Sequence, residues 1–159
     1  MYLLDTDILS NLIRRAPSTA LITKLASVPP EQQFTSSTTL GELVYGAQRL
    51  RERSEALLQR LEETLLPNLP VLPFDASAAR HCGGVRAELE RRGTPIGDAD
   101  LRIASIALDR DLAVVTGNVR HFEKVPCLAV ENWLEWICQD GSLKRGSESK
   151  WVSVRRQKC

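Results

Sequence analysis

Short apolar runs alternate with longer segments of helical periodicity along this 159-residue chain. Runs typical of buried strands occupy residues 2–7, 32–37, 69–74, 112–118 and 127–132. Segments with apolar residues at helical intervals lie between them, at 8–15, 19–28, 38–66, 75–92 and 99–111. Such alternation is typical of a parallel sheet with helices on both faces. The sequence therefore predicts a three-layer α/β fold around a mostly parallel sheet of about four to five strands.

Capping residues and breaks set the expected ends of the helices. We expect Asp7 or Ser10 to cap the helix after the first strand, and Asp98 or its neighbour to cap the last long helix. The 38–66 segment is long for one helix, so we expect two helices with a break near Ser54. The letters NWLEWI, residues 132–137, are interpreted as a last helical turn or two.

The length and the loss of periodicity near the end predict one domain followed by a tail. A chain of this size buries roughly two-thirds of its surface on folding, which is enough for a core without staples. Residues 139–159 have little apolar periodicity and carry six Lys/Arg against two acidic residues. We therefore assign residues 1–138 to the domain and 139–159 to a basic, flexible tail.

Composition narrows the classes of function. The net charge is +1, so no overall field favours nucleic acid or membrane surfaces. No run of about 18 apolar residues is present, and Asp5 and Asp7 interrupt the apolar N-terminal stretch, so we expect neither a membrane span nor a signal peptide. The four cysteines show no metal-ligand spacing and are expected to be reduced thiols. These features predict a soluble, cytoplasmic protein.

Polar side chains stand where predicted strands end or predicted helices begin. These candidate site residues are Asp5, Glu42, Asp98, Asp100, Thr116 and Asn118. Ligands of open α/β sheets bind outside the carboxyl ends of the strands. If the strands are neighbours, the carboxylates of Asp5, Glu42 and Asp100 converge on one cleft.

Three clustered carboxylates repel one another unless a cation lies among them. Oxygen ligands without a nearby His or Cys favour Mg²⁺, with Mn²⁺ as the alternative, over zinc. A metal-bound water is acidic enough to attack a phosphodiester. This reasoning predicts a metal-dependent hydrolase of phosphate esters.

Each acidic residue also has a simpler interpretation. Asp5 is a candidate helix cap, and Glu42 is a candidate solvated helix residue. Asp98 and Asp100 compete for the metal, and we favour Asp100 as the ligand because it shares a helix side with Ala104, with Asp98 as a cap or an outer contact. The two histidines have no partner in sequence, so no His-based triad is supported.

Four stretches together resemble a known family. LDTDILSNL, TTLGELVYGA, PIGDADLRIASIAL and VVTGNVRHFEKVPCLAVENW resemble, in this order, the motifs of PIN-domain proteins, and specifically those of VapC toxins from type II toxin–antitoxin systems. The resemblance covers residues 1–137. It implies a PIN-like fold and a Mg²⁺-dependent endoribonuclease that acts on RNA, often as a homodimer, and that is inhibited by a cognate VapB-type antitoxin.

The resemblance also implies roles for individual residues. Asp5, Glu42 and Asp100 match three of the family's acidic residues, and Thr116 and Asn118 match polar residues that help to hold metal or the attacking water. Arginines are candidates for phosphate contacts at the cleft rim, and they are Arg14, Arg15, Arg86, Arg91, Arg92, Arg102 and Arg120.

One position departs from the family pattern. His121 stands where the family often has Asp or Glu before the Phe. Either three carboxylates suffice, or Asp98 or Glu123 substitutes, and the number of metal ions stays open. The departure supports an alternative in which a PIN-like chain with weak turnover mainly binds RNA or a partner.

A haloacid-dehalogenase-like phosphatase is the rival enzyme class. The stretches DTD, VVTG and PIGDAD contain the residue types of that class's motifs, and the first aspartate would be the nucleophile. The order is wrong, because Thr116 follows Asp98 and Asp100, and no lysine lies between Lys24 and Lys124. We therefore favour the metal-dependent ribonuclease.

Overall fold

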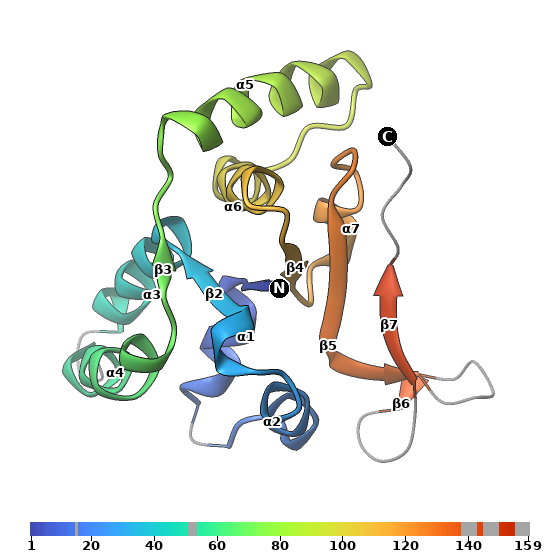
Figure 1. Ribbon diagram of the computed structural model, residues 1–159. Helices are drawn as coiled ribbons and strands as arrows, with labels where there is room; N and C mark the ends of the chain where they lie inside the picture. The colour runs from blue at the N-terminus through green and yellow to red at the C-terminus, as the bar shows by residue number, and fades with distance from the viewer. Residues whose placement is uncertain (15, 51–53, 138–142, 145–149, 155–159) are drawn as a thin grey trace.

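The fold is a three-layer α/β arrangement. The computed structural model describes residues 1–14, 16–50, 54–137, 143–144 and 150–154. Five parallel strands form the sheet in the order β3-β2-β1-β4-β5 (Figure 1). They are β1 Tyr2–Leu4, β2 Gln33–Ser36, β3 Val71–Leu72, β4 Ala113–Val115 and β5 Ala129–Ile137. The predicted parallel sheet is confirmed.

Helices cover both faces of this sheet. In Figure 1, α5 and α6 lie above the strands, and α1 and α2 lie below them. The α-helices are α1 Thr6–Leu12, α2 Thr19–Ala26, α3 Ser37–Arg49, α4 Ser54–Arg60, α5 Ala76–Arg91, α6 Asp98–Asp109 and α7 Val119–Phe122. The predicted division of the 38–66 segment into two helices is confirmed by α3 and α4, while residues 51–53 lie outside the described residues.

Two hydrophobic clusters form the core, one on each face of the sheet. Neighbouring residues of one strand serve different clusters, because successive side chains point to opposite faces. Leu3 and Val114 pack in the cluster beneath α5 and α6, whereas Leu4 and Val115 pack in the cluster with α1 and α2. All four are essentially unexposed. The central strands are therefore fixed in register at the edge where Asp5 and Thr116 follow them.

The interpretation of residues 132–137 as helix was wrong, because β5 continues to Ile137. Trp133 is fully buried and its ring lies 4.9 Å from that of Tyr2, edge to face. The side chain of Asn132 accepts a hydrogen bond from the Leu134 backbone N–H at 2.9 Å, and the pairing of β5 with β7 shifts register between Asn132 and Ile137. This irregularity breaks the strict alternation that marks a strand in sequence.

Part of the predicted tail pairs with the sheet. Two short strands, β6 Leu143–Lys144 and β7 Lys150–Val154, run antiparallel to β5. Sequence periodicity did not indicate them. The rest of 139–159 lies outside the described residues, and the domain boundary near residue 138 stays a prediction.

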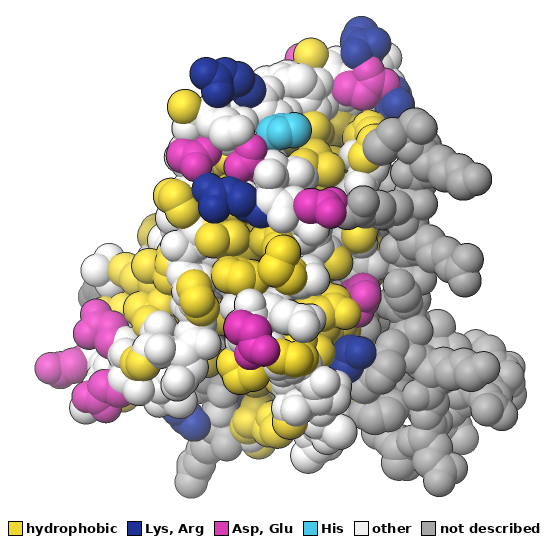
Figure 2. All heavy atoms as spheres, viewed as in Figure 1, with side chains coloured by type: hydrophobic (Ala, Val, Ile, Leu, Met, Phe, Trp, Pro, Cys, Tyr) yellow, Lys and Arg dark blue, Asp and Glu magenta, His cyan; other side chains and the backbone are white. Residues whose placement is uncertain are grey.

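The cysteines and the surface can also be compared with the predictions from sequence. Cys82 is a free thiol as predicted, but Cys127 is disulfide-bonded, so the prediction of a reduced thiol was wrong there. Among the described residues, no helix has the length and apolar character needed to cross a bilayer. On the face shown in Figure 2, Lys/Arg and Asp/Glu side chains intermix, and hydrophobic side chains reach the surface between them.

Candidate active site

Asp5 lies at the centre of the candidate site, directly after β1. Its backbone N–H donates to the Val115 carbonyl at 3.0 Å, which continues the β1–β4 pairing. One carboxylate oxygen accepts from the Thr6 N–H at 2.7 Å and the other accepts from the Thr116 hydroxyl at 2.8 Å. Asp5 is therefore the N-cap of α1, and the expectation that Asp7 or Ser10 caps this helix was wrong. The helix begins directly after Asp5, with no loop between it and the strand.

Asp7 points toward the end of β4. Its Oδ2 accepts a hydrogen bond from the Gly117 N–H at 2.6 Å, whereas its buried Oδ1 finds no hydrogen-bond partner among the described residues. A Cβ atom on Gly117 would stand 2.7 Å from Asp7 Oδ2 and 3.0 Å from the Leu134 side chain. Only glycine therefore allows this close approach.

The environment of these two carboxyl groups opposes their ionisation. Burial, followed by the charge of Asp7, raises the pKa of Asp5 to about 7 from 3.8, against the hydrogen bonds from Thr6 and Thr116. Asp100 adds a smaller repulsion. Burial likewise raises the pKa of Asp7, and the Gly117 N–H offsets part of that effect. Both carboxyl groups therefore ionise less readily than an ordinary aspartate, and a nearby cation would offset that cost.

Glu42 reaches the site from α3, one turn beyond its start. Ser36 caps this helix by accepting a hydrogen bond from the Thr39 N–H at 2.9 Å, and both residues are fully buried. The Thr6 hydroxyl donates to Glu42 Oε2. Thr6 therefore links Glu42 to the turn that holds Asp5. Sequence reasoning did not predict this role, because attention fell on the aspartates on either side of Thr6.

Asp100 lies in the first turn of α6 and contacts His121. The two join through Asp100 Oδ2 and His121 Nδ1, 2.7 Å apart, and the same nitrogen lies 2.8 Å from Asn118 Nδ2. The Asn118 N–H donates to the Thr116 hydroxyl at 2.9 Å, so a continuous chain of polar contacts runs from Asp5 to Asp100. His121 thus has a carboxylate partner in the fold that lies 21 residues away in sequence, which local sequence reasoning could not find.

Asp98 takes a different direction from the other acidic residues. Its side chain is 69% exposed and pairs with Arg86. Gly97 holds the N-cap position of α6, and no side chain caps that helix, so Asp98 is not the cap. The structure thus joins Asp5, Asp100, Thr116 and Asn118 in one network, attaches Glu42 through Thr6, and leaves Asp98 outside it.

The side chains are near one another but not clustered around a point. No group of three or more His, Cys, Asp or Glu side chains within the described part of the chain is arranged to hold a metal ion.

Sequence reasoning also missed Gly117. The VVTGN turn was the available signal, since a glycine next to two polar residues suggests close approach of the backbone.

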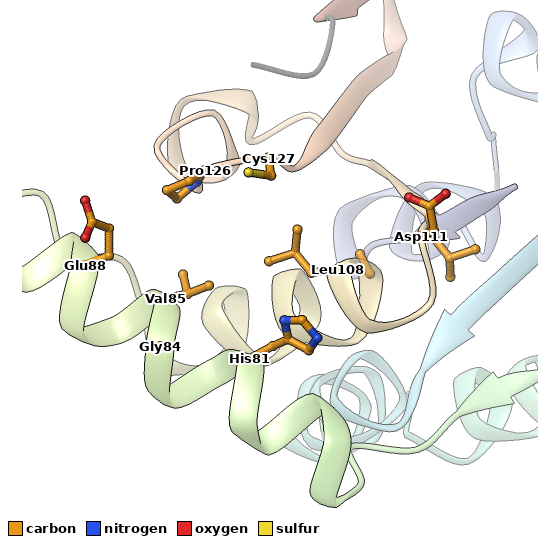
Figure 3. Close-up of a pocket in the computed structure, with 10 residues that line it drawn as sticks. His81, Gly84, Val85, Glu88, Leu108, Asp111, Pro126 and Cys127 are labelled. Carbon is orange, nitrogen blue, oxygen red and sulfur yellow. The ribbon is translucent and has the colours of Figure 1, made fainter. Parts of the chain in front are cut away.

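A separate hollow lies away from these strand ends. It has a volume of about 510 Å³ and opens between α5, α6 and residues 126–127 (Figure 3). His81 and Val85 of α5 face Leu108 of α6 across it. It contains none of the candidate site residues, so we assign the chemistry to the carboxyl edge of the sheet.

Comparison with known proteins decides the family. The family model for the PIN domain matches residues 2–127. This chain belongs to the PIN-domain family. Within that family it groups with the VapC proteins: it is 39% identical over 134 residues to the tRNA(fMet)-specific endonuclease VapC of Salmonella typhimurium, covering 83% of this chain and 97% of the relative. It is 36% identical over 135 residues to Ribonuclease VapC2 of Haemophilus influenzae, covering 84% and 98%.

Solved structures of PIN-domain proteins agree with the sequence relatives. DNA-bound VapBC from Salmonella typhimurium matches with a TM-score of 0.76 at 39% identity, covering 83% of this chain and 97% of that one. FitAcB from Neisseria gonorrhoeae matches with a TM-score of 0.75 at 31% identity, covering 82% and 96%. The predicted resemblance and fold are confirmed, and membership of the PIN family argues against the phosphatase alternative.

Proposed function

We propose that this PIN-domain protein is a Mg²⁺-dependent endoribonuclease and the toxin of a type II toxin–antitoxin pair. The observation that carries the proposal is the network from Asp5 through Thr116 and Asn118 to Asp100 at the carboxyl edge of the sheet. The named VapC nucleases, which share 36–39% of their residues with this chain, support RNA as the substrate. Because one of them is specific for tRNA(fMet), tRNA is the first RNA to test.

The chemistry of the site residues fits a hard divalent cation, although no three of the described acidic side chains surround one point. The buried, unpartnered Oδ1 of Asp7 and the raised pKa of Asp5 both describe carboxylates that a cation would stabilise. Asp5 and Asp100 would hold Mg²⁺ or Mn²⁺, with Glu42 completing the set. Asp98 is the weakest candidate, because Arg86 already neutralises it. When bound, the cation makes a water molecule more acidic and offsets negative charge on the phosphate.

The protein's own groups orient the carboxylates. The Thr116 hydroxyl donates to Asp5 and in turn accepts from the Asn118 N–H, so the Asp5 carboxylate is held in one orientation. Thr6 holds Glu42 through its hydroxyl. Such fixed placement is what reduces the cost of assembling a site for an anionic phosphodiester.

A binding protein with weak turnover is the second candidate. One observation favours it: His121 lies 2.7 Å from Asp100 Oδ2 and occupies an oxygen that a metal ion would need. In this alternative RNA or a partner binds at the same edge without being cut.

Partners follow from the same relationship. Solved structures of relatives include VapBC complexes bound to DNA, from Salmonella typhimurium and Rickettsia felis. By this relationship we propose a VapB-type antitoxin as the inhibitor and a homodimer as the working form. Action on cellular RNA would place the protein in the cytoplasm.

The decisive experiment is cleavage of a purified tRNA pool and of total RNA with Mg²⁺, with Mn²⁺ and with EDTA. Wild-type protein is expected to give defined fragments only with metal, and Asp5→Asn none. Glu31→Gln, an exposed acidic residue outside the site, is the matched control and is expected to cleave normally. Binding of RNA by wild-type protein without any fragments would favour the second candidate instead.

A further inference from the structure

A hollow of about 540 Å³ opens beside Glu42, between α3, Phe74 and the start of α6. Its volume falls in the range of pockets that hold small ligands. Because Glu42 contributes to its wall, anything bound here lies next to the proposed cleavage site. The proposed function uses Glu42 itself but leaves the hollow unexplained.

One face of α3 forms the floor of this hollow. Thr38, Gly41, Glu42 and Tyr45 lie at the helical spacing of three and four residues that places side chains on the same face. Gly41 contributes no side chain, and a Cβ atom built there would meet nothing within 4 Å. Tyr45 stands at the rim with 62% of its surface exposed, which is unusual for a large hydrophobic residue in this chain.

The rings of Tyr45 and Phe74 line the hollow together with Arg102, and Arg49 stacks on Tyr45 from outside the lining. The Arg49 guanidinium carbon lies 5.8 Å from the centroid of the Tyr45 ring, and that of Arg102 lies 5.8 Å from the centroid of Phe74. Exposed aromatic rings and arginine planes are the surfaces on which unpaired bases of RNA stack. The Tyr45 ring is already exposed, so stacking on it requires no unfolding of the core.

The charges around the hollow nearly balance. Glu42 and Asp98 bring two carboxylates to its wall and Arg102 brings one guanidinium group, while Arg86 pairs with Asp98. A neutral, flat base therefore fits the hollow better than an anionic phosphate, which would lie beside the Glu42 carboxylate. The hydroxyl-bearing residues Ser37 and Thr38 also line it and offer hydrogen bonds to a base edge.

We propose that this hollow binds one unpaired nucleobase of the RNA substrate, stacked on Tyr45, beside the phosphodiester that is cut. This inference rests on the proposed function and names the part of the substrate that the site recognises. It fits the intermixed charges of the face shown in Figure 2, because a protein without a broad basic surface on that face gains affinity from stacking as well as from phosphate contacts.

The first test compares steady-state cleavage of an RNA that the wild-type protein cuts. Tyr45→Ala is expected to raise KM about tenfold, the loss typical of a stacked base, and to leave kcat unchanged. Tyr45→Phe keeps the ring and is expected to keep the KM. Ile22→Ala is the matched control, since Ile22 is also exposed, at 45%, but lies on α2. Gly41→Leu places a side chain in the hollow and is expected to behave like Tyr45→Ala.

The second test identifies the base. A synthetic RNA spanning the cut carries one abasic nucleotide at each position in turn. An abasic nucleotide at one position near the cut is expected to raise the KM of the wild-type protein about tenfold. The same abasic RNA is expected not to raise the KM of Tyr45→Ala above its value for the intact RNA. If the wild-type protein cleaves RNA and Tyr45→Ala has the same KM, the base subsite is refuted and the proposed nuclease function is not. This conclusion holds even if Tyr45→Ala binds the antitoxin more weakly. No cleavage of any RNA by wild-type protein would refute the proposed function and the subsite together.

Discussion

Asp5 is 5% exposed, and its burial, together with the neighbouring Asp7, raises the pKa of its carboxyl group to about 7 from an ordinary value of 3.8. Between these two values the folded chain keeps a proton that the unfolded chain has released. The free energy of unfolding therefore falls as pH rises through this range and stays low above it. Asp5 is thus a residue whose chemistry lowers the stability of the metal-free protein.

Asp5→Asn is expected to raise the free energy of unfolding at pH 8 in EDTA relative to its effect at pH 4. A pKa difference of about 3 units corresponds to at most roughly 4 kcal/mol for this change between the two pH values. Urea denaturation of wild-type and variant protein at both pH values measures it. Mg²⁺ is expected to raise the Tm of the wild-type protein at pH 8 and to leave that of Asp5→Asn unchanged. An equal effect of the substitution at both pH values would show that the carboxyl group titrates normally.

Gly117→Ala is expected to damage the site without unfolding the chain. The added methyl group would overlap Asp7 Oδ2, so Asp7 must move and its hydrogen bond to residue 117 must break. We expect at least a tenfold loss of cleavage and a loss of roughly 1–2 kcal/mol in stability, typical of one strained buried contact. Cleavage assays with thermal denaturation measure both. Gly83→Ala on α5 is the matched control, because a methyl group there meets open space.

At the scale of elements, the start of α3 decides where Glu42 stands. Ser36→Ala removes the cap that accepts the Thr39 N–H and is expected to cost about 1–2 kcal/mol of stability, because the freed N–H is buried. Ser36→Thr retains a hydroxyl and is expected to restore most of that loss. Chemical denaturation of the three proteins provides the comparison. A loss below a few tenths of a kcal/mol in Ser36→Ala would mean that another group satisfies the Thr39 N–H.

The sequence predicted the elements of the sheet better than the contacts between them. Strand β4 and helix α6 were readable because their apolar spacing is regular and local. The contact of Thr116 with Asp5 joins residues 111 positions apart, and no local pattern encodes it. The same holds for His121 and Asp100. The family resemblance predicted which residues have functional roles. Their hydrogen-bond partners could be identified only from the folded structure.

The failures among the elements have local causes. The alternation of apolar and polar residues that marks a strand is interrupted within residues 132–137, where the pairing of β5 with β7 shifts register. The sequence therefore predicted a helix for this segment. The cap of α1 was placed two or more residues late, because Asp5 both follows the last strand residue and caps the helix, so no loop separates the two elements.

At the scale of the molecule, the predicted boundary near residue 138 is testable by truncation. The 134 residues shared with the Salmonella relative approach the length of the predicted domain. We expect a chain of residues 1–137 to fold and to cleave RNA. It would also expose the edge of β5 that pairs with β6 and β7, so we expect more self-association than in the full chain. Light scattering after size-exclusion chromatography, beside the cleavage assay, measures both. An unfolded or inactive 1–137 chain would move the boundary toward the C-terminus.

The sheet order has a consequence for synthesis on the ribosome. The first strand made, β1, lies at the centre of the sheet between β2 and β4, and β4 begins only at Ala113. Pairings so distant along the chain fold slowly, because a long loop must close before the contacts form. At about 5–20 residues per second, the nascent chain spends several seconds with Asp5 made and Thr116 not yet made. A growing polypeptide therefore lacks the assembled network of the proposed cleavage site until translation of the domain is nearly complete.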